Sequence, residues 1–469
     1  RKDYFIMKQR LLLLLSLAAL LSGCGITPAT SSSVEATTEP ASSRETPSEE
    51  PSEEPSLSSE EETPSSGSEA PSSVDGAIVL TKNHEGAPVS ILHPEIQRYC
   101  DDMYAAAEAQ GITGDKRYQI QEVDKSKSGY LCPNVFVTAY QGTSPNNDRD
   151  NFQPIELAWN AVSGYSGKYV VKYSTKADLS DWKQVETDTN AAELINLRCD
   201  TTYYWKAETA DKSHDSQIGS FHTKGYFRDI TCGPAYNVRD WGGKMTSSGR
   251  KTKQGVLYRG GEIITTPFNQ MGVNQPHIVT CDATTVKVMH DDLKIRKEID
   301  LRNAGAETNY QEKSCLGDDV QFLKKASGSG YATMWNNGGS VIKEILNIIA
   351  TGTEESAVYF HCWGGADRTG TLGFLLDGLC GVSFLEAIMD YEFTSFDTIH
   401  TRRRDSQVND GQFNYDFRPL ISGMKSSTYY SQSATKTFAD VVERWMKGKL
   451  GMSQTEIDNL KNALLEPVA

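Results

Sequence analysis

A glycine-rich stretch with the sequence HCWGGADRTGT, residues 361–371, lies between two apolar runs of different length. The run before it, AVYF at 357–360, has the length of a buried strand, and the run after it, Thr371–Leu379, has the length of a helix. Residues 338–351, ahead of the strand, carry apolar side chains at helical spacing. This order predicts a helix, a buried strand, a tight loop and a second helix, which is how α/β folds are assembled.

The predicted loop has the form of an anion-binding site. A loop between a strand and a helix directs successive backbone N–H groups and the positive end of the helix dipole toward one point. Cys362 lies inside this loop, and Arg368 stands where the helix begins. An ordinary thiol, with a pKa of ~8.5, is mostly protonated at neutral pH, but a helix N-terminus and a cation lower that pKa to ~3.5–7.5. Cys362 is therefore predicted to be a nucleophile.

Other residues of the loop are suited to the same chemistry. The planar guanidinium of Arg368 can hold two oxygens of a phosphoryl group, and the hydroxyl of Thr369 can donate to the sulfur as it leaves. Gly364, Gly365 and Gly370 allow the backbone to approach an anion closely. The loop is thus predicted to bind and transfer a phosphoryl group.

Two alternatives concern what the loop contacts. Trp363 either lines the mouth of the site, where an aromatic face suits an aryl phosphate, or packs against a neighbour.

Residues 365–370 have the G-x-x-x-x-G spacing of a nucleotide-binding loop, but Thr371 stands where that loop needs Lys, which argues against ATP or GTP. Chance occurrence of H-C-x-x-G-x-x-R-T-G in a chain this long is on the order of a few in a million. The pattern therefore favours a phosphate-binding nucleophile over a buried cysteine beside an ordinary glycine turn.

The stretch resembles the signature of the cysteine-dependent protein tyrosine phosphatase superfamily, H-C-x5-R-[ST], which His361, Cys362, Arg368 and Thr369 match. Three upstream motifs resemble those of its bacterial tyrosine/serine (dual-specificity-like) branch, which includes secreted enzymes acting on phosphoproteins and phosphoinositides. These motifs are YNVRDWGG (Tyr236–Gly243), GVLYRGGEI (Gly255–Ile263) and EIDLRNAGAE (Glu298–Glu307). The resemblance covers residues 226–469, about half of the chain.

The resemblance implies a tyrosine-phosphatase-like α/β or α+β fold over residues 225–469, with a central sheet of four or five strands flanked by helices. It implies no metal, no cofactor and a covalent cysteinyl-phosphate intermediate on Cys362. His361 would belong to the environment of the thiolate. The phosphate would be bound by the loop residues Trp363, Gly364, Gly365, Ala366, Asp367 and Arg368.

The acid that protonates the leaving oxygen is expected to be an aspartate. No Trp-Pro-Asp triplet occurs in the chain, so the mobile acid loop of the best-known tyrosine phosphatases is not located by sequence. Asp367 matches the aspartate of the branch's C-x-x-G-K-D-R pattern and is the first candidate, and Asp300 in EIDLR is the second. For either residue the alternative is a carboxylate that orients Arg368.

The substrate class follows from one departure from the pattern. Ala366 stands where relatives often carry lysine, which would favour highly charged phosphoinositides. Its absence favours phosphotyrosine in a protein or another small phosphomonoester, with a phosphoinositide or inositol phosphate as the alternative. The run Arg402–Arg404 would partly compensate; we interpret it as a solvated helix end, with a contact to an anionic head group as the alternative. A surface adhesion or binding protein with a degenerate phosphatase domain is the alternative from another class, but Cys362, Asp367 and Arg368 are intact.

The first 24 residues have the pattern of an export signal, since basic residues precede the apolar run Leu11–Leu21, which is shorter than the ~20 residues that span a membrane. The Leu-Ser-Gly-Cys that follows resembles the lipobox of bacterial lipoproteins. That resemblance implies acylation of Cys24 and an extracytoplasmic protein anchored to the bacterial membrane, with ordinary secretion as the alternative. Residues 25–75, rich in Ser, Thr, Glu and Pro, predict a disordered tether or a glycosylated stalk.

The chain of 469 residues is too long for one compact core and is predicted to be multidomain. Residues 76–130 contain one amphipathic stretch, Pro94–Ala109, that predicts a helix, and no role follows from them. Residues 131–224 contain short β-rich runs that predict an all-β sandwich. Trp159, and Leu197 ahead of Tyr203, resemble a fibronectin type III or immunoglobulin-like domain, to which we assign a spacer or docking role.

Cysteine use and charge limit the partners and the metal chemistry. Besides Cys24 and Cys362, seven cysteines remain, none in a C-x-x-C pair, so one or two disulfides and at least one free thiol are expected. The net charge is −15, and no basic face is evident, which argues against nucleic acid as a partner. Near the C-terminus, Phe438–Met446 and Ile457–Leu465 are predicted helices, the second with a capping box.

Overall fold

The computed structural model describes residues 77–142, 151–263, 281–303, 311–397, 401–409 and 414–467. The predicted signal peptide, lipidation at Cys24 and tether therefore lie outside the described residues. Within the described part of the chain, no helix combines the length and apolar character needed to cross a lipid bilayer.

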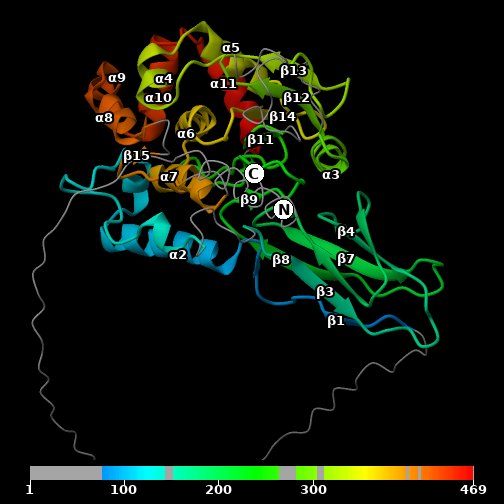
Figure 1. Ribbon diagram of the computed structural model, residues 1–469. Helices are drawn as coiled ribbons and strands as arrows, with labels where there is room; N and C mark the ends of the chain where they lie inside the picture. The colour runs from blue at the N-terminus through cyan, green and yellow to red at the C-terminus, as the bar shows by residue number, and fades with distance from the viewer. Residues whose placement is uncertain are drawn as a thin grey trace, which may run out of the picture. The chain divides into compact units, whose positions relative to one another are not determined.

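The central sheet has six strands in the order β13-β12-β14-β11-β10-β9 (Figure 1). Four of them run parallel and two short ones pair antiparallel at one edge. Their bounds are Arg228–Asp229 (β9), Arg239–Asp240 (β10), Leu257–Gly260 (β11), Ile295–Asp300 (β12), Gln321–Lys324 (β13) and Ala357–His361 (β14). The resemblance implies four or five strands, and the short edge strands β9 and β10 account for the larger number.

Helices cover both faces of this sheet, and the strand pleat divides the side chains between them. In β14, Val358 and Phe360 belong to one hydrophobic core, and Ala357 and Tyr359 to another, as the period of two requires. The first core is built mainly by α4 (Tyr331–Asn337), α5 (Ser340–Ile349), α6 (Arg368–Cys380), α7 (Phe384–Phe393), α8 (Arg418–Ser426), α10 (Phe438–Gly448) and α11 (Gln454–Leu464). The second contains Met289 of the π-helical η4 (Val286–Asp292), which directly follows the short α3 (Ala283–Thr285).

The predicted helices and the buried strand next to the glycine-rich stretch occur within a few residues of the expected bounds. In α5, Ile342, Ile345, Leu346 and Ile349 are buried, which is the i, i+3, i+4, i+7 face of a helix. The predicted capping box forms at the start of α11. Smaller elements in the same part are α9 (Thr428–Gln432), η5 (Thr394–Phe396), β15 (Val408–Asn409) and β16 (Asn414–Tyr415).

A second group of strands forms two sheets around one core that contains Trp159 and Trp205. One sheet has the order β2-β8-β7-β4-β5 and the other β1-β3-β6. Their bounds are Leu80–Lys82 (β1), Val89–Ser90 (β2), Ile155–Trp159 (β3), Tyr169–Ser174 (β4), Lys183–Thr187 (β5), Ala191–Leu194 (β6), Thr202–Thr209 (β7) and Gly219–Lys224 (β8). The hydroxyl of Tyr203 accepts a hydrogen bond from the backbone N–H of Arg198 at 2.8 Å. Assignment of this β unit to the fibronectin type III or immunoglobulin-like class stays a prediction.

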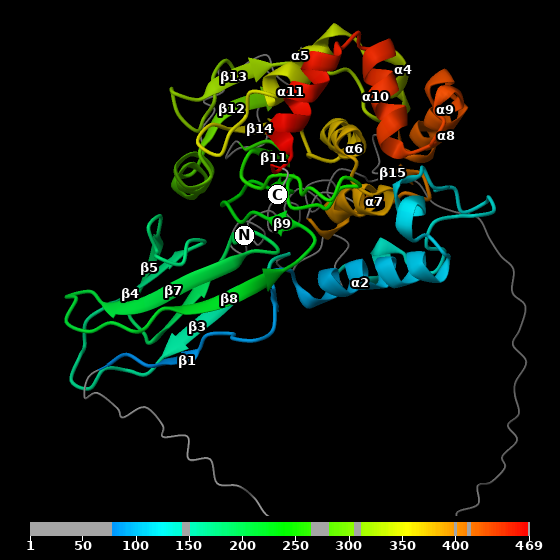
Figure 2. The ribbon, with the colours of Figure 1, turned by 180° about the vertical axis from the view of Figure 1, so that it is seen from behind.

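The helix α2 (Pro94–Ala109) forms at the predicted bounds, but it does not stand apart from the sheet and helices. Its buried residues Ile96, Tyr99 and Met103 belong to the same core as α6, α7 and α10, and Figures 1 and 2 show α2 beside α7. The short helices η1 (Gly114–Tyr118) and η2 (Val137–Ala139) follow it.

The structure thus divides the chain differently from the predicted boundaries at 130 and 225. Residues 78–91 contribute strands and core side chains to the β unit, whereas residues 92–140 contribute to the α/β unit. The physical reason is that neither segment carries enough apolar surface to form a core of its own.

One disulfide, Cys281–Cys315, is present among the described residues. The six other described cysteines are buried thiols: Cys100, Cys132, Cys199, Cys232, Cys362 and Cys380. One disulfide with free thiols remaining agrees with the range expected from the count.

Candidate active site

The strand β14 carries the predicted nucleophile to the carboxyl edge of the sheet. In the sheet register, His361 lies opposite Gly260 of β11 and opposite Asp300 of β12. Because these strands are parallel, the segments that follow them leave at the same edge. Cys362 comes directly after β14, and Arg368 is the first residue of α6, so the loop between them lies at this edge.

Three successive carbonyls of this loop are bound by donors from outside it. The donors all come from the segment 236–262, which holds two of the upstream motifs. They are the Tyr236 hydroxyl and the Glu262 N–H, each 3.0 Å from the Trp363 oxygen, Asn237 Nδ2, 2.9 Å from the Gly364 oxygen, and Arg259 Nη2, 3.0 Å from the Gly365 oxygen.

The consequence concerns the amides of the loop. The C=O and N–H groups of one trans peptide point in opposite directions, so the N–H groups that follow these carbonyls, at residues 364–366, point away from the donors. Among the described residues, no backbone carbonyl accepts from the N–H groups of residues 363–367. A row of amides next to a helix N-terminus is a binding site for an anion.

Gly365 is required at its position for two reasons. Its φ is +68°, a conformation that L side chains rarely adopt. A Cβ atom there would also lie 2.3 Å from the carbonyl carbon of Gly260 and 2.6 Å from the nitrogen of Gly261. The loop therefore rests directly on the backbone at the end of β11.

Two fully buried arginines lie beneath the loop and share one carboxylate. Arg239 Nε and Arg259 Nη1 each lie 2.7 Å from a different oxygen of Asp390 on α7. Burial and the neighbouring Arg239 lower the pKa of Arg259 to about 10, which leaves it charged at neutral pH. Arg259 also donates to the carbonyl of Gly365, so this charge cluster connects the loop to α7.

The thiol of Cys362 is almost fully buried, and its pKa is nevertheless lowered. Burial raises that pKa, but the charge of Arg368 and hydrogen bonds from the side chain and backbone N–H of Thr369 lower it by more. The Thr369 hydroxyl is buried and has no hydrogen-bond partner among the described residues, which leaves its proton available to the sulfur. These are the two residues that the sequence predicts for this purpose.

His361, the residue before the nucleophile, is held between two acceptors. Its Nδ1 lies 3.1 Å from the carbonyl oxygen of Cys362, and its Nε2 lies 3.0 Å from Oε1 of Glu298 on β12. Burial lowers the pKa of His361, but the hydrogen bond to Glu298 and the charge of Asp300 raise it by more. Both ring nitrogens face acceptors, which suits a protonated imidazole that donates on each side.

Asp300, the second candidate for the acid, is in the wrong environment for that role. It is fully buried, and its two oxygens lie 2.9 Å from Nε and Nη2 of Arg302. Burial raises the pKa of Asp300, but His361 and Arg302 lower it by more, so that it stays ionised. We correct the prediction accordingly: Asp300 orients Arg302, not Arg368, and has no surface from which to protonate a ligand.

Asp367, the first candidate, lies at the edge of the loop with a partly exposed carboxylate. Its Oδ1 and Oδ2 accept hydrogen bonds from Arg402 Nε at 2.7 Å and Arg402 Nη2 at 3.0 Å, and Oδ1 also accepts one from the Tyr331 hydroxyl. The alternative role for Asp367 is that of a carboxylate that orients Arg368. In the structure, Asp367 pairs with Arg402 instead.

The run Arg402–Arg404 is therefore not a solvated helix end, and that prediction is wrong. It lies in irregular backbone, and each guanidinium pairs with a carboxylate, namely Asp367, Asp405 and Glu392 respectively. Arg402 and Arg404 are fully buried. Because all three charges are neutralised, the run does not supply the positive charge that a lysine at position 366 would bring.

The remaining predicted residues lie in the same loop. Ala366 is fully buried, and Trp363 is half-buried. The Nη1 atom of Arg368 lies 3.4 Å from the carbonyl oxygen of Leu301, which follows β12. No cluster of three His, Cys, Asp or Glu side chains that would hold a metal ion occurs among the residues that the structure describes.

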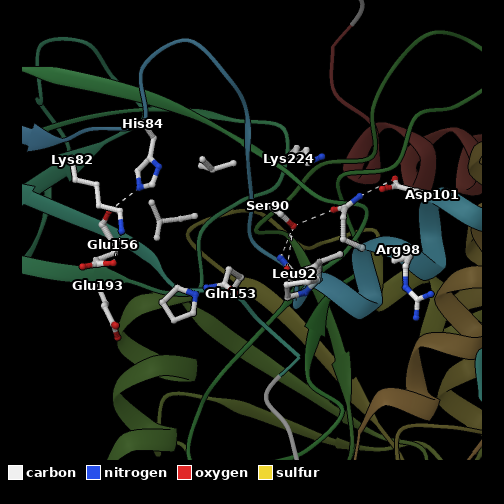
Figure 3. Close-up of a pocket in the computed structure, with 15 residues that line it drawn as sticks. Lys82, His84, Ser90, Leu92, Arg98, Asp101, Gln153, Glu156, Glu193 and Lys224 are labelled. Atoms are coloured by element: carbon white, nitrogen blue, oxygen red, sulfur yellow. Dashed lines mark hydrogen bonds and ion pairs between the residues drawn. The ribbon is translucent and has the colours of Figure 1, made fainter. Parts of the chain in front are cut away.

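A surface hollow elsewhere in the molecule contains none of these residues (Figure 3). It lies between strands of the β unit and the start of α2, and Figure 3 shows Lys82 and His84 on the β-unit side and Arg98 and Asp101 on α2. Its basic and acidic side chains are mixed, and Lys82 already pairs with Glu156. We find no chemistry in it that resembles that of the loop.

Several residues that hold the site were missed by sequence reasoning. Four of them lie in the quoted motifs: Tyr236, Asn237 and Arg239 in the first and Arg259 in the second. The motifs indicated that these residues matter, but not which groups they contact. Asp390 and Arg402 lie downstream in stretches without a motif. Only the fold brings these two residues to the loop.

Comparison with known proteins gives three findings. A family model described as tyrosine phosphatase family matches residues 230–466, half of the chain. A tyrosine-protein phosphatase from Nostoc commune is 29% identical over 122 residues, which are 22% of this chain and 41% of that protein, so the chain spans about two fifths of the length of this relative. The crystal structure of the core catalytic domain of the PP-IP phosphatase SIW14 from S. cerevisiae, in complex with citrate, matches with a TM-score of 0.21 and 13% identity over 32% of this chain and 78% of that one.

Proposed function

Because this chain belongs to the tyrosine phosphatase family, we propose that it is a cysteine-dependent phosphomonoester hydrolase, a protein-tyrosine or dual-specificity phosphatase. The observation that carries the proposal is the thiol of Cys362, whose pKa is lowered by Arg368 and Thr369 inside a loop of inward-pointing amides. A nucleophile and an anion site at one point are what transfer of a phosphoryl group to sulfur requires.

In the first step, the Cys362 thiolate attacks phosphorus, an S–P bond forms and the bond from phosphorus to the leaving oxygen breaks. Arg368 and the loop amides hold the equatorial oxygens, where negative charge spreads in the transition state. We propose Asp367 as the acid that gives a proton to the leaving oxygen. Among the two predicted acids, only its carboxylate has exposed surface at the loop, which supports this choice.

In the second step, water attacks phosphorus, the S–P bond breaks and the thiolate returns. The proton of the water passes to the Asp367 carboxylate, which restores the acid. The hydroxyl of Thr369 then stabilises the departing thiolate, and the lowering of the Cys362 pKa by Thr369 supports its assignment to this step. The residues around the reaction thus act by orientation and charge, and the chemistry calls for no redox change.

We propose a phosphorylated protein, with phosphotyrosine first, as the substrate. The charges near the loop support this choice over a phosphoinositide or inositol phosphate. The two buried guanidinium groups of the basic run, Arg402 and Arg404, are each paired with a carboxylate, and Ala366 brings no charge. A ligand with several phosphates therefore lacks counter-charges from these residues.

The experiment uses p-nitrophenyl phosphate with EDTA present, and compares the full chain with Cys362→Ser. Turnover by the first and not by the second supports the proposal. Equal rates would leave only the alternative of a binding protein with a degenerate domain. A panel of phosphotyrosine, phosphoserine and phosphothreonine peptides and phosphoinositides in vesicles then tests the substrate class.

We also propose that the chain is lipid-anchored through Cys24 on the outer side of a bacterial membrane. The lipobox-like Leu-Ser-Gly-Cys and the Ser/Thr/Glu/Pro-rich tether support this proposal. Metabolic labelling with a radioactive fatty acid is expected to label the full chain in the membrane fraction. A Cys24→Ala chain that stays labelled and membrane-bound to the same extent would contradict it.

A further inference from the structure

The segment 94–141, here called the brace, comes before the region matched by the family model, yet it contacts the residues that surround Asp367. The brace consists of α2, the short helices η1 and η2, and the loops that connect them. Two groups of contacts join it to residues 392–404. One is centred on Arg404 and Glu392, and the other on Gln141.

Arg404 ties the brace to the end of α7. Glu392 Oε1 accepts the backbone N–H of Arg404 at 2.8 Å, and Oε2 accepts both the Arg404 guanidinium and the hydroxyl of Tyr99 on α2, the latter at 2.6 Å. Removal of one partner from such a buried pair is strongly destabilising. The same guanidinium donates to three carbonyls of the brace: Leu131 at 3.3 Å, Cys132 at 3.1 Å and Val135 at 2.7 Å.

Gln141 ties the end of the brace to the residues next to Arg402. Its side-chain amide donates to the carbonyl of Ser395 and to the hydroxyl of Thr401, the latter at 3.1 Å. The Ser395 hydroxyl in turn accepts from the backbone N–H of Arg402 at 2.8 Å and donates to its carbonyl at 2.7 Å. The backbone of Arg402 is thus fixed from the side of the brace.

The side chain of Arg402 is fixed from the other side. Its guanidinium lies 3.9 Å from the centre of the Tyr415 ring and holds both oxygens of Asp367. Tyr331 also donates to Asp367, and it does so from a backbone with φ of +55°, which is rare for a bulky residue. Strained backbone of this kind persists where the surroundings require it, and it concentrates at functional sites.

We infer that Arg402 is a positioning residue, which sets the direction of the Asp367 carboxylate at the loop, and that the brace belongs to the catalytic unit because it holds Arg402 in place. The inference rests on the proposed function, since it assigns a purpose to the geometry of the proposed acid. It also extends the catalytic unit to residues upstream of the β strands that separate the brace from the rest.

The test measures how the rate depends on the leaving group. A general acid matters for a poor leaving group, such as the phenol of phenyl phosphate, and matters little for the acidic phenol of 2,4-dinitrophenyl phosphate. Arg402→Lys in the full chain is expected to lower kcat/KM for phenyl phosphate ~10- to 100-fold and to change the dinitrophenyl ester less than ~3-fold. Gln141→Ala, which removes no buried charge, is expected to show the same pattern with a ~3- to 10-fold loss.

The matched control is Arg403→Lys. Arg403 is the next residue, and it pairs with Asp405 instead of a loop residue. Both substrates are expected to react at the wild-type rate. The Asp367→Asn chain serves as the reference, because Arg402→Lys added to it is expected to cause no further loss if Arg402 acts through Asp367.

Equal losses for the two esters in Arg402→Lys and Gln141→Ala would overturn the inference and leave the phosphatase proposal standing. So would a full Arg402→Lys effect in the Asp367→Asn background. If the Arg402→Lys chain does not fold, as judged by circular dichroism, the half-buried Gln141 carries the test alone. A wild-type chain that hydrolyses neither ester would instead refute the proposed function itself.

Discussion

At the scale of single residues, one methyl group at position 365 is enough to disturb the site. Gly365→Ala combines a left-handed backbone with contacts far below van der Waals distance to Gly260 and Gly261. We expect kcat/KM to fall at least ~100-fold, since the loop must move by about 1 Å. The free energy of unfolding should fall by ~2–4 kcal/mol in a denaturant titration.

Gly249→Ala is the matched control for this substitution. Gly249 has φ of +75°, but a Cβ there meets nothing within 4 Å. It should lower the free energy of unfolding by ~1 kcal/mol and leave turnover unchanged. Equal effects of the two variants on activity would show that the close approach of residue 365 to β11 is unimportant.

The second residue-scale prediction concerns the pH dependence of thiol reactivity. Arg368 and Thr369 lower the pKa of Cys362, whereas burial raises the pKa of Cys132 to about 11 and that of Cys199 to about 12. A lowered pKa means that the thiolate persists as the pH falls below the ordinary thiol value. Among the cysteines that the structure describes, Cys362 should therefore be the one that iodoacetamide modifies at pH 7, as read by peptide mass spectrometry.

Arg368→Ala should shift the midpoint of this alkylation profile to higher pH, because the cation that favours the thiolate is gone. Arg296→Ala is a suitable control, since Arg296 pairs with Asp319 and lies on β12 outside the loop. An unchanged midpoint in Arg368→Ala would mean that the helix and the amides alone set the pKa of Cys362.

At the scale of elements, the segment 236–262 acts as a support that holds the loop carbonyls. Asn237→Asp keeps a residue that tolerates its φ of +55° but replaces the donor to the Gly364 carbonyl with an acceptor. We expect inhibition by inorganic phosphate to weaken ~10-fold or more, because the amides lose their inward direction. Inhibition constants measured with p-nitrophenyl phosphate check this prediction.

The control for this variant is Asn196→Asp. Asn196 has a similar φ of +58° and donates to the carbonyl of Thr231 at 2.9 Å, outside the loop. Phosphate inhibition should be unchanged in it. If both variants weaken inhibition equally, the loss reflects general destabilisation and the support role of Asn237 is refuted.

The same elements show how far sequence reasoning reaches. The strand, the loop and α6 were predictable because they depend on local periodicity and on glycine at Gly365. The partner of Asp367 was not, because Arg402 is brought to it by packing and not by spacing. Charged runs are ordinarily solvated, and nothing local distinguishes Arg402 and Arg404 from an exposed pair.

Element boundaries show the same limit. The bounds of α2 could be predicted from its amphipathic pattern. The core that it joins could not, because an apolar helix face does not indicate which element will pack against it. The edge strands β9 and β10 have two residues each and no pattern of their own. They form because β11 offers an edge to β10, and β10 in turn offers one to β9.

At the scale of the whole molecule, the brace determines where the chain can be cut. Removing residues 77–229 exposes the side of α7 that Tyr99, Met103 and Leu131 help to cover. Each buried side chain of this kind contributes ~1.5–3 kcal/mol. A chain of residues 230–466 should therefore aggregate or melt at least ~10 °C below the full chain, as measured by scanning calorimetry.

A chain that begins at residue 77 is the control, because it keeps every residue that the structure describes. Its melting temperature and kcat/KM should equal those of the full chain. A stable and fully active 230–466 fragment would show that the family region is self-sufficient and that the brace adds nothing.

The chain alternates between its two cores, since residues 78–91 join the β unit, 92–140 the α/β unit, 155–221 the β unit again and the rest the α/β unit. During synthesis, α2 leaves the ribosome long before α7 exists, so its apolar face has no partner while the rest of the β unit, residues 155–221, is made. Neither unit corresponds to one continuous stretch of gene. Transfer of one continuous stretch of gene therefore cannot exchange either unit alone.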